Sequence, residues 1–131
     1  MRRVKSAERI LAVQRQLQRL EERKLGEIQQ QERAVHADRQ DILQSLNDKE
    51  VLHGLFVFAM AKRLRRLDEE TARLELEKSV VSRRLLEQGR RRKRAETLYE
   101  SVSDAWRREE DRRELLSIID QTASSTKASL P

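Results

Sequence analysis

Histidine and cysteine, two side-chain types that often catalyse reactions or bind transition metals, are nearly absent from this 131-residue chain. The only histidines, His36 and His53, are seventeen residues apart, and there is no cysteine. Catalysis and metal binding need several such groups converging in one pocket, and neither histidine has a second candidate at ligand spacing. The three glycines are isolated, so no phosphate-binding loop of the GxxxxGKS/T or GxGxxG type is present. We therefore predict no enzymatic activity, no catalytic residue, no metal, no cofactor and no small-molecule substrate.

The most concentrated chemical feature is a run of five cations, here called the basic block: Arg90, Arg91, Arg92, Lys93 and Arg94. Residues 83–94 hold seven basic side chains and one acidic side chain. The net charge of this segment is therefore +6, which equals the net charge of the whole chain. Such density attracts phosphates or acidic surfaces. Recognition of bases would add aromatic side chains, and none lies in 83–94, which argues against nucleic acid. Two interpretations remain open: a partner-binding surface, or the solvated face of a charged helix.

The composition predicts the elements that carry this block. Charged residues make up 40% of the chain and aromatic residues 3%, with 3 Gly and 1 Pro. A compact globule needs more large apolar side chains, whereas this mixture is typical of long helices. The longest apolar run, Leu55–Ala61, is far shorter than the ~20 residues of a membrane span. We predict an all-α protein with no membrane insertion and a cytoplasmic location.

The second half of the chain has the clearest pattern. Steps of four and three from Met60 reach Leu116, and eleven of the seventeen positions on this path are apolar. That spacing is typical of a coiled-coil seam, and it predicts one helix from near residue 50 to near residue 119. Arg92 falls on the seam, which favours the partner-binding interpretation of the basic block. The seam consists of Met60, Leu64, Leu67, Thr71, Leu74, Lys78, Val81, Leu85, Gln88, Arg92, Ala95, Tyr99, Val102, Trp106, Glu109, Arg113 and Leu116.

The first half carries two apolar registers that differ by one residue. Residues 10–20 place apolar side chains at Ile10, Val13, Leu17 and Leu20, and residues 28–46 place them at Ile28, Val35, Ile42 and Leu46. A four-residue stutter near Gly26 would join the two registers and unwind the supercoil locally. We therefore predict one long helix with a weak point at Gly26.

The connection is predicted between residues 46 and 54. Asn47 with Glu50 resembles a capping box that starts the second helix near residue 48, whereas Gly54 after His53 resembles a Schellman stop. Either signal leaves a short link, so the helices must be antiparallel. Residues whose numbers add up to roughly 100 would then face each other. We expect a hairpin over 1–121, a longer second helix that overhangs from Tyr99, and a disordered tail over 122–131.

Two apolar groups are further candidate binding surfaces. The tip cluster beside the turn cannot all be buried by one partner helix, so it is either a packed tip or a partner patch. The overhang either has no partner in the hairpin, in which case such strips dock into grooves of other proteins, or is covered because the first helix reaches further along the second than the pairing estimate allows. The tip cluster contains Leu52, Leu55, Phe56, Phe58 and Met60. The overhang strip contains Tyr99, Val102 and Trp106 with Leu115, Leu116, Ile118 and Ile119.

The segments Arg91–Ser101, Ala105–Leu115 and Ile119–Asp120 resemble the C-terminal part of the FliJ, YscO and HrpO proteins of type III secretion, flagellar or injectisome. Members of that family have similar lengths and form antiparallel helical hairpins, so the architecture resembles them over the whole chain. The sequence pattern resembles them over about residues 90–120. The positions that match the family pattern are the basic block, Leu98 and Asp120.

The resemblance implies a stalk of the export apparatus. Its partners would be the hexameric export ATPase ring, the export gate protein and export chaperones, at the cytoplasmic side of the inner membrane. Residues 2–20 and 90–119 would face the ring, and residues 46–60 would lie at the far end. Two alternatives remain: a self-associating structural coiled coil, and a basic coiled coil associated with nucleic acid.

Overall fold

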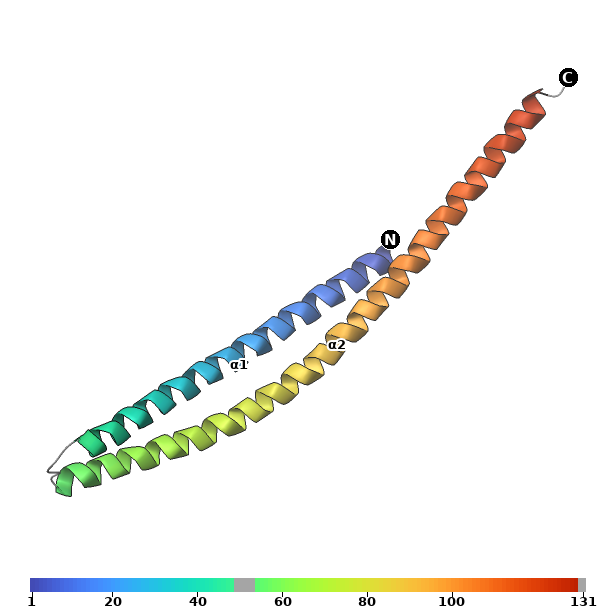
Figure 1. Ribbon diagram of the computed structural model, residues 1–131. Coiled ribbons are helices and arrows are strands. Elements are labelled where there is room, and N and C mark those ends of the chain that lie inside the picture. The colour runs from blue at the N-terminus through green and yellow to red at the C-terminus, as the bar shows by residue number, and fades with distance from the viewer. Residues whose placement is uncertain (49–53, 130–131) are drawn as a thin grey trace. The chain divides into compact units, whose positions relative to one another are not determined.

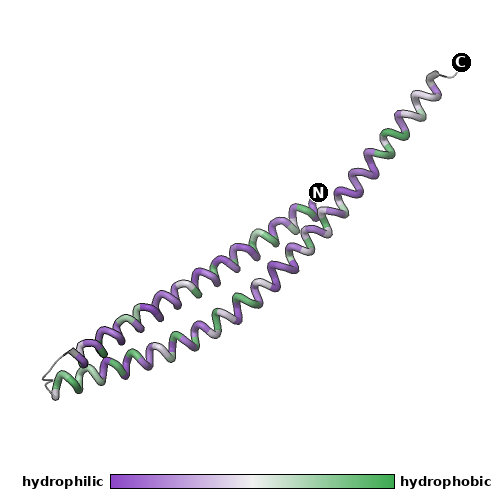
Figure 2. The backbone as a smooth tube through the Cα atoms, in the orientation of Figure 1, coloured by the Kyte–Doolittle hydropathy of each residue, from purple (hydrophilic) through white to green (hydrophobic). Residues whose placement is uncertain are grey.

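The computed structural model describes residues 1–48 and 54–129, which form two helices, α1 (Arg2–Asp48) and α2 (Gly54–Ser129) (Figure 1). The helices pack antiparallel as a hairpin with the second helix longer, and the described residues contain no strand, so the predicted fold class is confirmed. Hydrophobic residues alternate with hydrophilic ones along both helices (Figure 2), as expected for helices that bury a single seam.

The ends of the helices differ from the prediction in two places. Asn47 lies inside α1, and α2 begins at Gly54, so the predicted start near residue 48 is wrong. Gly54 does not adopt a left-handed conformation either, because no described glycine has a positive φ. The half-buried Leu46 keeps the last turn of α1 packed, which explains why the helix passes Asn47. The connecting residues 49–53 lie outside the described residues.

The tail predicted over 122–131 is helical as far as Ser129, so that prediction is wrong for residues 122–129. Two hydroxyls bond back along the helix, from Thr122 to the carbonyl oxygen of Ile118 and from Thr126 to that of Thr122, each at 2.9 Å. These bonds satisfy the small polar side chains within the helix. No glycine or proline interrupts the segment before Pro131.

The chain divides into two compact units, each made of one segment from each helix. Unit 1 contains Met1–Gln16 and Arg90–Pro131, and unit 2 contains Leu17–Gly89. Unit 2 has a core of Ile28, Leu74 and Val81, against which Leu25 and Val35 pack. Leu74 has no exposed surface, so this core is the best-packed site in the described part of the chain.

Ion pairs flank the core of unit 2 and fix which residues face each other. The ammonium of Lys78 lies 3.4 Å from Glu32, and the guanidinium of Arg39 lies 3.5 Å from Asp68. The numbers of these facing residues add up to about ten more than predicted, because α2 begins later than the capping box indicates.

The predicted seam of α2 is confirmed from Met60 to Val102. Every seam position in this range is buried or half-buried, including the polar Thr71, Lys78, Gln88 and Arg92. Within unit 1, Ala7 and Leu11 of α1 and Ala95 of α2 are buried. The final seam positions, Glu109, Arg113 and Leu116, are exposed.

The predicted register of residues 10–20 is wrong. The four side chains Ile10, Val13, Leu17 and Leu20 are 39 to 51% exposed. In each case the next residue along the chain faces inward instead. These inward positions continue the heptad spacing of Ile28, Ile42 and Leu46 without a stutter. Gly26 is exposed, and a Cβ atom added to it would meet nothing within 4 Å, so it needs no special backbone. In unit 1 the inward positions are Val4, Ala7, Leu11 and Gln14, and in unit 2 they are Gln18, Glu21 and Leu25.

Arg73 forms the densest ion-pair group of unit 2. It bonds to both carboxylate oxygens of Glu70, and its Nη1 donates to Glu77 Oε1 at 2.6 Å. The hydrogen bond from Arg73 and its charge lower the pKa of Glu70, although desolvation opposes them. Both groups are exposed, so the pair contributes little to stability.

We expect the Arg73→Gln variant to raise the pKa of Glu70 back towards its ordinary value, because the charge and the bidentate bond are lost together. A carboxyl-carbon NMR titration measures this pKa directly. The sign follows from the lowered pKa: the pair is intact above the pKa of an unfolded glutamate and is lost as the pH falls through the lower folded value. A pKa of Glu70 that is unchanged in the variant would contradict the assignment.

Candidate partner-binding surfaces

The net positive charge of the chain comes entirely from unit 1. Unit 1 carries 15 basic and nine acidic residues, and unit 2 carries 14 of each sign. In unit 1 the segment Met1–Gln16 adds five basic residues and one acidic residue to the five cations of the basic block. The basic block therefore lies in a unit whose α1 segment is also basic, and the two segments together form a positive surface.

Within the basic block, Arg92 differs from its neighbours because it faces inward. Its Nη1 donates to Glu96 Oε1 at 2.8 Å, and its Nε is buried without a hydrogen-bond partner. Arg15 of α1 also approaches Glu96 Oε1, at 3.8 Å. Glu96 therefore lies close to one cation from each helix, and its single negative charge offsets one of the two positive charges.

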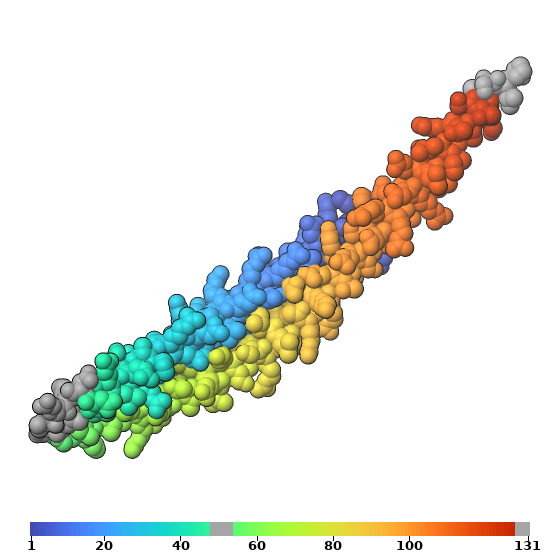
Figure 3. Space-filling model, in the orientation of Figure 1, coloured from blue at the N-terminus to red at the C-terminus, as the bar shows by residue number. Residues whose placement is uncertain are grey.

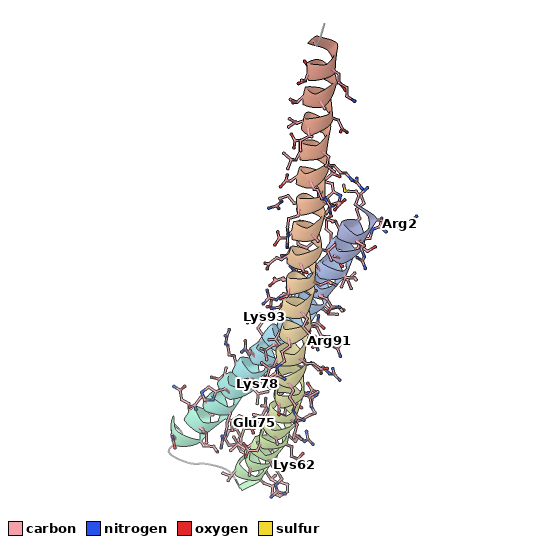
Figure 4. The ribbon with its side chains drawn as sticks, turned by 90° about the vertical axis from the view of Figure 1, so that its right-hand side faces the viewer. Arg2, Lys62, Glu75, Lys78, Arg91 and Lys93 are labelled. Carbon is pink, nitrogen blue, oxygen red and sulfur yellow. The ribbon has the colours of Figure 1, made fainter. Side chains whose placement is uncertain are left out.

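The other four cations of the basic block are exposed. At ~100° per residue, and with Arg92 turned inward, these four cations spread over an arc of roughly 160° on the opposite, outer side of α2. Figure 4 shows Arg91 and Lys93 on different sides of the helix. The basic block therefore presents a broad positive face on the side of α2 opposite Arg92.

The predicted overhang begins later than Tyr99. Tyr99 and Val102 are half-buried, and Tyr99 lines a groove together with Leu11 and Ala12 of α1. The first helix therefore covers these positions, and the prediction that they are uncovered is wrong. The cause is again the later start of α2. Each residue of α1 therefore faces a residue of α2 that lies further towards the C-terminus than predicted. Leu98 and Trp106 are exposed at the margin of this contact.

The uncovered part of unit 1 begins after Glu110, because every described side chain beyond it is exposed. The far part of α2, red in Figure 3, has no α1 segment against it. Most of its apolar residues do not continue the strip of Trp106. Leu115 comes nine residues later, and ~100° per residue places it on the opposite side, where Ile118 and Ile119 also lie, whereas Leu116 stays in the register of the seam. Asp120 lines a shallow depression with Arg113 and Leu116. The predicted single strip is therefore two separate surfaces.

The tip cluster is divided between packing and exposure. Leu55 and Phe58 are exposed, whereas Phe56 and Met60 are half-buried. Leu52 lies outside the described residues. The cluster is thus partly packed and partly exposed, and the choice between a packed tip and a partner patch stays open.

Unit 2 also contains a groove that was not predicted from the sequence. It lies between residues 24–31 of α1 and 76–84 of α2, with the exposed Leu76 and Val80 at its edge. The available signal was the four-residue spacing of these two apolar residues outside the seam. His36 borders a different groove of unit 2, beside Arg33 and Thr71.

In the described ranges 1–48 and 54–129, no cluster of three or more His, Cys, Asp or Glu is placed to hold a metal ion. Neither helix, as far as it is described, has a stretch long and apolar enough to cross a membrane. The fold and its surfaces define an antiparallel coiled-coil hairpin with exposed charged and apolar regions. Comparison of the chain with protein-family models, curated proteins and solved structures found no significant match.

Proposed function

We propose that the protein is a stalk of a type III protein export apparatus, which binds the hexameric export ATPase and links it to the export gate and chaperones. The resemblance of residues 90–120 to the FliJ, YscO and HrpO proteins suggests this function. The helical hairpin is compatible with it. Its place would be at the cytoplasmic face of the inner membrane, held there by its partners.

The observation that carries the proposal is the concentration of the whole positive excess in unit 1. The segments expected to face the ring, residues 2–20 and 90–119, largely coincide with this unit. The exposed cations of the basic block cover the outer side of α2, which is the side that the inner wall of a ring would contact. The exposed Leu55 and Phe58 lie in the region proposed to contact the export gate.

Replacing Arg91, Arg92 and Arg94 by Gln is expected to weaken binding to the export ATPase of the same organism at least tenfold, or about 1.4 kcal/mol. The exposed charges of Arg91 and Arg94 are lost from the proposed contact, the inward Arg92 no longer offsets Glu96, and the loss of affinity should shrink as salt rises. Binding is measured by biolayer interferometry with the assembled hexamer. Circular dichroism checks that the helices are retained.

A matched variant replaces Arg63, Arg65 and Arg66 of unit 2 by Gln, which removes the same charge from three exposed positions. We expect it to bind the ATPase as the unchanged chain does. Equal losses in both variants would show a non-specific charge effect. Unchanged affinity in the variant of the basic block would end the proposal for that surface.

The basic surface of unit 1 also favours a second candidate, association with nucleic acid. Phosphate contacts release counterions, so the affinity for DNA or RNA would fall steeply with salt. A fluorescence anisotropy titration of a labelled duplex at two salt concentrations tests this function. Tight, salt-dependent binding that the basic-block variant loses would favour it over the stalk.

A further inference from the structure

The groove in unit 2 has the features of an incomplete helical interface. It has a volume of about 510 Å³, and Ile28 and Val81 of the core line it. Leu76 is 72% exposed and Val80 is 44% exposed, although both lie beside this apolar lining. Exposed leucine and valine side chains next to a groove bury apolar area when another helix packs there.

The α1 side of the same groove is also extended by apolar residues. Lys24 and Glu27 line it, and steps of three and four back along α1 lead to Leu20 and Leu17, which are exposed. Unit 2 therefore lines the groove with apolar side chains from both helices, Ile28 of α1 and Leu76, Val80 and Val81 of α2, and Leu20 and Leu17 lie beyond its end on α1. The exposed area is small compared with the roughly 800 Å² per partner of a stable dimer, so an occupant binds weakly and reversibly.

The charges at the edge of the groove indicate which occupant fits. Glu77 and Arg84 both line it, and they are seven residues apart on α2. A heptad separation places two residues on nearly the same side of a helix. Two antiparallel α2 helices related by a twofold axis between Val80 and Val81 would therefore place Glu77 of each copy beside Arg84 of the other.

A second observation about charge agrees with this occupant. Unit 2 has 14 basic and 14 acidic residues, so two copies of it do not repel each other through net charge. A strongly acidic or basic partner would find no complementary excess there. In a twofold pairing of antiparallel helices, two opposite charges one heptad apart on each copy attract the matching charges on the other copy. Glu77 and Arg84 of the groove are such a pair of charges.

We infer that a second copy of this chain docks in the unit 2 groove, with the two α2 helices antiparallel about a twofold axis near Val80. Leu76 and Val80 of each copy then fill the groove of the other, over Ile28 and Val81. Glu77 already accepts a hydrogen bond from Arg73 of its own helix, so in the dimer its carboxylate lies between this Arg73 and Arg84 of the other copy. The two Glu77–Arg84 pairs fix the direction and the register. This surface is separate from the basic block and the tip cluster, so the inference does not rest on the proposed stalk function.

A charge exchange tests the pairing. The average mass of the full chain in sedimentation equilibrium should rise with concentration towards that of a dimer. We expect Glu77→Arg and Arg84→Glu each to weaken this association about tenfold, because each places like charges together twice in the dimer. The double variant should recover most of the loss, since it restores opposite charges. A monomer at every concentration, or a double variant as weak as the single ones, would overturn the inference.

Cross-linking tests the position of the axis independently of charge. The chain has no cysteine, so a single introduced thiol can link only to its counterpart in another copy. Val80→Cys, next to the axis, should form a covalent dimer at least about fivefold faster under mild oxidation than Ser82→Cys, which turns to the far side of α2. Both residues are exposed, so access is matched. Equal rates would place the contact elsewhere and overturn the proposed geometry.

Discussion

Replacing Leu74 by alanine is expected to lower the free energy of unfolding by about 2–5 kcal/mol. Leu74 is fully buried, and with Ile28 and Val81 it forms the core of unit 2. Truncation removes its apolar contacts and leaves a cavity that two helices held along their length close only in part. Urea unfolding followed by circular dichroism at 222 nm measures the loss.

Leu76→Ala is the matched control, because Leu76 lies two residues further along the same helix and is largely exposed. Its effect on unfolding should stay within roughly 0.5 kcal/mol when measured at concentrations low enough to avoid dimers. Similar losses in the two variants would contradict the packing of α2, since they would require both faces of the helix to be buried.

The seam of α2 could be predicted from the sequence because its apolar residues follow one register throughout. Steps of four and three even placed the polar Lys78 and Gln88 on the buried side, where the structure has them. A polar residue gives no local signal of burial. Its position relative to Leu74 and Val81 does, since the helix is continuous through all of them.

The register of residues 10–20 could not be predicted in the same way. Ile10, Val13, Leu17 and Leu20 form a more apolar stripe than the inward positions, which include Gln14, Gln18 and Glu21. Local pattern therefore favours the wrong face. The register is fixed elsewhere, by Ile28 and Ile42, and continuing it avoids the local unwinding that a stutter would cause.

The candidate surfaces were predicted unequally. The basic block is visible in sequence, and the structure adds that Arg92 turns inward towards Glu96. The extent of the overhang depends on the turn, and shifting the centre of a turn by a few residues moves each pairing partner by twice that number. Because the turn was predicted too early in the chain, Tyr99 and Val102 were expected to lie beyond the end of the first helix. In the structure both are half-buried.

The polar seam of α1 leads to a second large expected effect: Glu21→Leu should raise the free energy of unfolding by about 1–3 kcal/mol. The Glu21 side chain is only 16% exposed, and its Oε2 is buried without a hydrogen-bond partner. Its Oε1 lies 3.6 Å from the ammonium of Lys24, a partly exposed pair that offsets little of this cost. Leucine at this inward position would place apolar surface in the seam instead.

Glu22→Leu is the control that separates burial from helix propensity, which is nearly equal for glutamate and leucine. Glu22 is exposed and accepts one hydrogen bond from Gln18 Nε2 at 3.1 Å, so its replacement should change unfolding by no more than roughly 0.5 kcal/mol. Urea unfolding compares the two variants. A gain in both would assign the effect to the helix alone, and a loss in Glu21→Leu would show that residue 21 does not face the seam. A gain in Glu21→Leu alone is expected, because in the structure the heptad register carries this carboxylate into the interface while Leu17 and Leu20 stay outside.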